Sequence, residues 1–240
     1  MSGFVLKIIA LVCMTIDHLF KIFPDFFTQI PLPPIPFGEG SISAVGLIAL
    51  LGRISFPIFA YIVAESCRYT KNRKNFLLRL LFFAIISEFP FNLSFGSQNV
   101  MWTFLLAALA IFIYDDINNR FIGLIIAACF VLLSHYARTD YSGFGVLLVF
   151  TLYIIKPKPI KLLASFMLIC IHYLYTRGML SSILSGDTEA LINSILPFIF
   201  TQISVILLAF YNGKKGRNMK WFFYFYYPLH LLILGGIKLL

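Results

Sequence analysis

The 240-residue sequence has few charged residues and few cysteines. Aspartate, glutamate, lysine and arginine together make up 12% of the chain, whereas they make up roughly 25% of a soluble domain. Because 60% of the residues are hydrophobic, the composition excludes an ordinary soluble protein and predicts a polytopic membrane protein. The four cysteines show no CxxC pair and no spacing typical of metal ligands, so we expect no metal site.

The sequence also lacks the signature motifs of soluble catalytic domains. It contains no Walker loop, no glycine-rich dinucleotide fingerprint, no nucleophile elbow and no HExxH motif. These absences exclude a soluble catalytic domain of those types. Any chemistry must therefore come from polar residues within the apolar part of the chain.

Apolar runs long enough to cross a bilayer repeat along the whole chain. With about 20 apolar residues per span, we predict about nine spans. They lie near residues 4–23, 48–68, 75–95, 99–115, 120–135, 141–156, 159–176, 190–211 and 220–239. The predicted fold is an all-α, multi-pass helical bundle, a single integral-membrane domain over residues 1–240 in the cell (cytoplasmic) membrane.

Basic residues gather in three short loops near residues 68–74, 156–161 and 214–220. Such loops are typical of the cytoplasmic side, so the pattern predicts a cytoplasmic N-terminus and a C-terminus outside. The net charge of +9 then reflects topology, and we expect no nucleic-acid partner. Residues 24–47 fall outside in this topology, and the prolines and aromatics of Phe23–Phe37 predict an extended interfacial loop: a lid, an acceptor-docking surface or a stiff connector.

Asp17 and His18 are adjacent within the first apolar run. An ionisable group at membrane depth costs at least ~2.5–3.5 kcal/mol on insertion scales, so it is usually paired, faces a wet cavity or takes part in chemistry. Neighbours on a helix diverge by about 100°, so we expect Asp17 to pair with Arg53 or Lys21, and His18 to act as a general base. The alternatives are a structural ion-pair cluster joining the first two spans, and an Arg53 that only reaches the outer interface.

In three predicted spans a proline lies close to an ionisable residue. The pairs are Arg53 with Pro57, Glu88 with Pro90, and His230 with Pro228. A proline inside a helix frees backbone carbonyls and kinks the helix, so these positions suggest a common cavity with Glu88, Asp140 and His230 as supporting polar groups. For His230 alone, a structural histidine bonded to a neighbouring carbonyl is the simpler interpretation.

The segment after the second predicted span is strongly basic. It includes Arg68, Lys71, Arg73, Lys74 and Arg79. These cations can bind the phosphates of a nucleotide-like donor such as coenzyme A, although membrane topology alone also explains them. We expect nearby Glu65 to pair with Arg68 or Arg79.

Taken together, seven motifs resemble the TraX family of polytopic membrane proteins. They are Met14–Phe20, Gly52–Tyr61, Tyr69–Asn72 followed by Leu78–Leu80, Ile86–Asn92, Asn99–Thr103, Asp140–Gly145 and Tyr226–His230. The resemblance covers nearly the whole chain. It implies that Asp17, His18, Arg53, Glu88, Asp140 and His230 belong to recurring family motifs.

TraX proteins are associated with N-terminal acetylation of pilin subunits in conjugative transfer, and the family resembles transmembrane acyltransferases that act on sugars and lipids. The resemblance implies cytoplasmic acetyl-CoA as the donor. The acceptor is then a pilin or other peptide N-terminus, or an envelope glycan or lipid. In the predicted mechanism His18 takes a proton from the acceptor, while Asp17 and Arg53 set the local charge.

Two other classes of function remain open. A proton-coupled transporter or flippase also uses kinked spans with charges near the bilayer midplane, but the inverted repeat that it typically has is not evident. A non-catalytic partner in pilus or envelope assembly is the third possibility. It would tolerate replacement of His18, whereas an enzyme would not.

Overall fold

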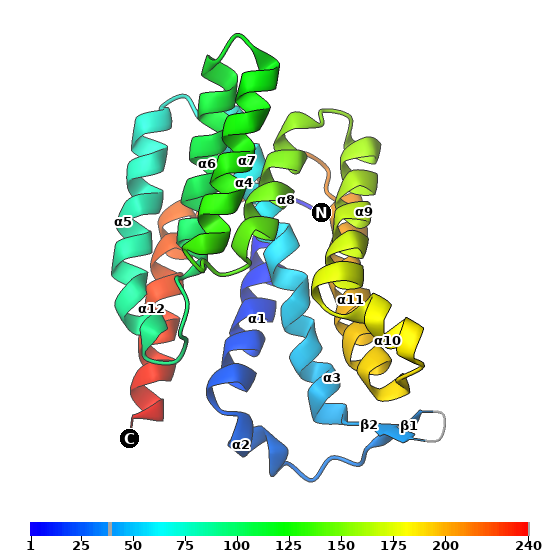
Figure 1. Ribbon diagram of the computed structural model, residues 1–240. Helices are drawn as coiled ribbons and strands as arrows, with labels where there is room; N and C mark the ends of the chain where they lie inside the picture. Colours follow the sequence, from blue (N-terminus) through cyan, green and yellow to red (C-terminus); the bar gives the residue numbers. More distant parts are fainter. Residues whose placement is uncertain (38–39, 240) are drawn as a thin grey trace. The chain divides into compact units, whose positions relative to one another are not determined.

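The structure is a computed structural model that describes residues 1–37 and 40–239 (Figure 1). The first helices are α1 (Gly3–Ile22), α2 (Pro24–Thr28), α3 (Ala44–Leu50), the 3-10 helix η1 (Leu51–Ile54) and α4 (Ser55–Tyr69). They are followed by α5 (Arg73–Asn92), α6 (Val100–Asp116), α7 (Arg120–Tyr136), α8 (Ser142–Ile154), α9 (Lys158–Thr176), α10 (Met179–Ser185), α11 (Thr188–Ala209) and α12 (Lys220–Lys238). One short antiparallel pair, β1 (Ile35–Phe37) with β2 (Gly40–Ile42), is added to this helical fold.

The prediction of a helical membrane protein is confirmed at this level, and each predicted apolar run contains a helix. In the described part of the chain, five helical segments are long and apolar enough to cross a membrane: Gly3–Ile22, Ala44–Tyr69, Arg73–Asn92, Lys158–Thr176 and Thr188–Ala209. The apolar helices α7 and α8 are shorter, with 17 and 13 residues. Nine spans and the orientation of the termini stay predictions.

The chain folds into two compact units. Unit 1 comprises residues 1–58 and 169–217 with the C-terminal residues from Gly236, and unit 2 comprises residues 59–168 and 218–235. Boundaries between the units fall within α4, within α9 and near the end of α12. The single domain expected over residues 1–240 stays a prediction.

In unit 1, α1 packs against α3 and η1, and α11 packs against the same two elements. The 3-10 turn has a local cause, because Pro57 has no N–H and leaves the carbonyl of Arg53 without its α-helical partner. The N-terminus is fixed by the basic segment that follows α11. The Gly3 N–H donates to the Lys214 carbonyl at 2.8 Å, and the Phe4 N–H donates to the Lys215 carbonyl at 3.0 Å.

In unit 2, α6 packs against α5, α7 and α8, and α7 also packs against α8 (Figure 1). Ala107, Ala108 and Ala110 of α6 are fully buried, and their small side chains allow the neighbouring helices to approach closely. α12 lies against α5, where the Phe83 ring stacks on Tyr224 with centroids 4.9 Å apart (Figure 1).

Candidate functional site

A pocket of about 430 Å³ lies in unit 1 beside the C-terminal half of α1. Its charged lining residues are Asp17 and Lys21 of α1 and Arg53 of η1, and most of the remaining lining is apolar. Asp17 is buried, and its Oδ2 lies 2.5 Å from Nζ of Lys21, which confirms the predicted pairing one helical turn apart. This volume lies within the roughly 300–1,000 Å³ that is typical of ligand pockets.

Gly52 explains how η1 reaches this part of α1. A Cβ at Gly52 would lie 2.3 Å from Cβ of Asp17 and 2.9 Å from its Cα, so only glycine permits the observed approach. The hydroxyl of Ser55 donates to the Gly52 carbonyl at 2.8 Å, which satisfies a carbonyl of the 3-10 turn. The local geometry thus places Arg53 at the pocket that Asp17 lines.

His18 is placed differently from Asp17. Its side chain is 6% exposed, and it is not one of the described residues that line the pocket. The divergence of about 100° between neighbours on a helix accounts for this difference. The structure therefore places two of the three predicted catalytic residues, Asp17 and Arg53, at one pocket. The third, His18, is buried and is not part of the described pocket lining.

The segment after α1 also contributes to the pocket. Residues 24–28 form α2, so the prediction of an extended loop is wrong there; a proline at the first helical position is preorganised for a helix start. Phe27 of α2 stacks on Phe20 of α1, with centroids 3.9 Å apart. Both rings line the pocket. Residues 38 and 39 of the segment predicted to lie outside, 24–47, are not among the described residues.

Glu88, a predicted supporting residue, forms a polar joint between α5 and α6 in unit 2. Its Oε2 accepts hydrogen bonds from the Asn99 side chain and from Nε1 of Trp102, the latter at 3.0 Å. Asn99 is fully buried and also donates to the Ala84 carbonyl at 2.8 Å. Asn99 and Trp102 both lie in the motif Asn99–Thr103, but no local sequence signal marks them as partners of Glu88.

Asp140 and His230 lie in unit 2 as well. Oδ1 of Asp140 accepts a hydrogen bond from the Tyr141 N–H at 3.1 Å, and Tyr227 of α12 interacts electrostatically with Asp140 and Glu88. Nδ1 of His230 lies 2.8 Å from the Tyr226 carbonyl, the kind of contact that the structural interpretation of this histidine predicts. The cavity shared by all predicted polar residues stays a prediction.

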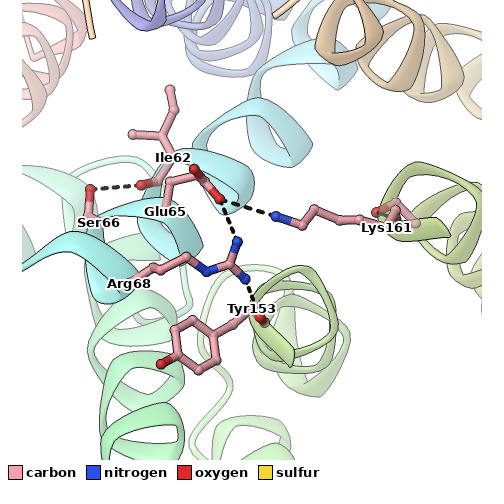
Figure 2. A network of polar contacts seen from close by, with 7 residues as sticks. Ile62, Glu65, Ser66, Arg68, Tyr153 and Lys161 are labelled. Atoms are coloured by element: carbon pink, nitrogen blue, oxygen red, sulfur yellow. Dashed lines mark hydrogen bonds and ion pairs between the residues drawn. The ribbon is translucent and has the colours of Figure 1, made fainter. Parts of the chain in front are cut away.

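Within the basic segment, Arg68 belongs to a partly buried network of polar contacts (Figure 2). Oε1 of Glu65 accepts from Nη1 of Arg68 at 3.2 Å and from Nζ of Lys161 at 3.1 Å, while Nη2 of Arg68 donates to the Tyr153 carbonyl. The Glu65–Arg68 pair was predicted, whereas Lys161, which is 2% exposed, was missed. This network joins α4, α8 and the first part of α9.

The other basic residues divide into three environments. Arg73 is paired with Asp115 at 2.9 Å and with Asp116 at 2.6 Å, so the acidic C-terminal end of α6 neutralises it. Lys71 and Lys74 are exposed, and Arg79 lines a second pocket. The five basic residues that were predicted to bind the phosphates of the donor therefore do not form one cluster.

Comparison with known proteins decides the family. The family model described as TraX protein matches residues 2–238. The chain belongs to the TraX family. A similar protein is the "Probable fimbrial assembly protein FimC, serogroup H1" of Dichelobacter nodosus, 27% identical over 262 residues that cover 99% of this chain and 96% of the relative. No solved structure matches the chain.

The pocket in unit 1 gives this TraX protein a defined chemical environment. Two cations, Lys21 and Arg53, and one carboxylate, Asp17, line mostly apolar walls. In such surroundings cationic donors can stabilise a developing oxyanion, and a carboxylate can bind an amine or accept a proton. Among the described residues, no group of three or more histidine, cysteine, aspartate or glutamate side chains is placed to hold a metal ion.

Proposed function

We propose that this TraX protein is a membrane acetyltransferase that moves an acetyl group from acetyl-CoA to the N-terminal amine of a pilin-type peptide in the cell membrane. The observation that carries the proposal is the pocket of unit 1, where Asp17, Lys21 and Arg53 line apolar walls. Family membership and the fimbrial assembly relative support a peptide acceptor over an envelope glycan or lipid.

In the proposed reaction the acceptor nitrogen attacks the carbonyl carbon of the acetyl thioester. His18 takes the proton of the amine, and the guanidinium of Arg53 stabilises the oxyanion. The C–S bond then breaks, and the coenzyme A thiolate leaves and takes up the proton from His18. An α-amino group has a pKa of about 7.7–8.0, so an imidazole is a suitable base for it.

The burial of His18 sets a condition on this mechanism. A general base must come within hydrogen-bond reach of the proton that it removes. The His18 imidazole must therefore turn toward the pocket when the acceptor binds. Asp17 already lines the pocket and is the alternative base.

For the donor, we propose that Lys71 and Lys74 bind the phosphates of acetyl-CoA. Both side chains are exposed, whereas Arg68 and Arg73 are already paired with carboxylates. Calorimetry with the protein in nanodiscs tests this part. Replacing both lysines with glutamine should weaken acetyl-CoA binding about 5- to 30-fold, since each exposed charge contributes up to about 1 kcal/mol.

The central experiment measures transfer of labelled acetyl from acetyl-CoA to a peptide with a free N-terminus. An N-terminally blocked peptide serves as the negative control. His18→Gln and Arg53→Gln should each lower the rate about 100-fold or more, as expected for loss of a general base or of an oxyanion donor. Asp25→Asn is the matched control, because Asp25 is an exposed acid of α2 outside the pocket lining.

The outcomes separate the candidate roles. An active His18→Gln with an inactive Asp17→Asn assigns the base to Asp17. If folded protein transfers acetyl to neither a peptide nor a glycan, the enzyme proposal is wrong. The melting temperature of each variant distinguishes lost chemistry from unfolding, because breaking a buried pair destabilises a protein.

A further inference from the structure

A second pocket lies in unit 2 between α5 and the start of α12. Its volume is about 310 Å³. It is lined by Asn75, Leu78, Arg79, Phe82, Phe83 and Trp221. The acetyl-transfer proposal does not use this pocket.

Arg79 is the charged residue of this lining, and no carboxylate lines the pocket in the described part of the chain. Its guanidinium interacts with the Tyr224 hydroxyl and lies 5.9 Å from the centroid of Phe76, while its buried Nε has no hydrogen-bond partner among the described residues. A partly buried cation is usually paired with an anion. The guanidinium of Arg79 in this pocket can therefore bind an anion that does not belong to the chain.

The acidic residues of unit 2 have other partners. Glu65 binds Arg68 and Lys161, and the two aspartates at the C-terminal end of α6 bind Arg73. Glu88 accepts hydrogen bonds at the start of α6. None of these carboxylates takes part in lining the pocket around Arg79.

The position and the walls of the pocket are those of a membrane interface. Arg79 lies six residues into α5, about 9 Å along the axis from the basic N-terminal end of that helix. Trp221 lies one residue into α12, and Nζ of Lys220 is 4.9 Å from the centre of its ring. Tryptophan and lysine at helix ends are typical of the headgroup region.

The apolar lining is open to the surroundings of the protein. Leu78 is 50% exposed, and Phe82 and Trp221 are each 53% exposed. Below them, Phe83 stacks on Tyr224 and contacts Phe225 edge-on at 5.2 Å, which gives the pocket a rigid aromatic base. One cation beside an exposed apolar wall matches a molecule with an anionic head and hydrocarbon chains.

We propose that this pocket binds the headgroup of an anionic phospholipid. The phosphate oxygens contact the guanidinium of Arg79, the Asn75 side chain bonds to the polar head, and the acyl chains follow Leu78 and Phe82. A choline headgroup would bring a further cation close to Arg79 and Lys220, so the site discriminates against phosphatidylcholine. Basic pockets between membrane helices bind anionic lipids in this way.

Quenching of tryptophan fluorescence by brominated lipids tests the proposal. The chain has two tryptophans, so Trp102→Phe leaves Trp221 as the reporter in the pocket. Brominated phosphatidylglycerol should bind about fivefold more tightly than brominated phosphatidylcholine, since one basic residue contributes about 1 kcal/mol. Adding Arg79→Gln should bring this ratio to about one.

Arg120→Gln is the matched control and should leave the ratio unchanged. Arg120 is an exposed arginine at the start of α7, 4.9 Å from the ring centre of Tyr114 and outside the pocket. Retained quenching by brominated phosphatidylcholine shows that a variant is folded in the bilayer. Native mass spectrometry of the unsubstituted protein, with retained phosphatidylglycerol as its readout, repeats the test without the Trp102 replacement.

Three results would overturn the proposal. One is a ratio near one between the affinities for phosphatidylglycerol and phosphatidylcholine in the protein that retains Arg79. Another is a ratio of these affinities that Arg79→Gln does not change. The third is loss of the phosphatidylglycerol preference on adding inorganic phosphate or coenzyme A, which would assign the pocket to a water-soluble phosphate ligand. None of these depends on acetyl transfer, so this proposal and the proposed function fail separately.

Discussion

Gly52→Ala tests whether the contact between η1 and α1 builds the pocket of unit 1. The new Cβ would lie 2.3 Å from Cβ of Asp17 and 2.7 Å from its Oδ1, below the 3.0 Å that real Cβ contacts respect. Its third neighbour, Cα of Asp17, is backbone and cannot rotate away. Either η1 or α1 must therefore shift.

The expected cost follows from the stiffness of packed interiors. Overpacking typically costs about 1–3 kcal/mol, and a backbone neighbour favours the upper end of this range. For a chain of this length we expect the melting temperature to fall by about 2–12 °C. Thermal unfolding in detergent, followed by tryptophan fluorescence, measures this change.

Gly46→Ala is the control on the same helical segment. A Cβ there would meet Cβ of Ser43 at 3.5 Å, which is ordinary van der Waals contact. Replacing a helical glycine with alanine stabilises a helix by roughly 0.5–1 kcal/mol, so the melting temperature should stay the same or rise. Equal melting temperatures for the two variants would refute the close approach at Gly52.

Two further predictions concern polar joints in unit 2. Asn99→Ala should lower the free energy of unfolding by about 2–4 kcal/mol, because it removes the cap of α6 together with the bonds to Glu88 and the Ala84 carbonyl. Asn119→Ala, which removes only the cap of α7, should cost about 0.5–2 kcal/mol in the same denaturation assay. Lys161→Met should destabilise by about 1–3 kcal/mol, because it leaves the half-buried Glu65 carboxylate with one cation fewer.

Controls separate these effects from general losses. Lys156→Met changes an exposed lysine in the loop before α9 and should lie within about 0.5 kcal/mol of the unsubstituted protein. Equal losses of unfolding free energy for Asn99→Ala and Asn119→Ala would show that the hydrogen bonds between Asn99 and Glu88 do not stabilise the protein. A Lys161→Met variant as stable as the control would show that Arg68 alone satisfies Glu65.

The sequence predicted the helices because their signal is local. An apolar run of sufficient length must satisfy its backbone within itself in a membrane, so hydropathy alone locates each helix. Two ion pairs could also be predicted from the sequence alone. Asp17 with Lys21 and Glu65 with Arg68 lie four and three residues apart, a spacing that brings side chains together on any helix.

The helix α2 could have been found from the same kind of signal. Pro24 stands at a first helical position and Asp25 in the first turn, both of which favour a helix start. The density of prolines after residue 30 instead favours an extended loop. The local preference of these two residues was stronger than the average composition of the segment.

Only the tertiary structure decided which distant residues meet. Lys161 reaches Glu65 across 96 positions, and Arg73 pairs with Asp115 and Asp116 at the end of α6, 42 and 43 positions further on. It also decided that Asp17 and Arg53 line one pocket while His18 is buried outside it. The reason is physical: hydrophobic patterning determines where helices form and which faces are apolar, but packing determines which charged side chains lie within bonding distance.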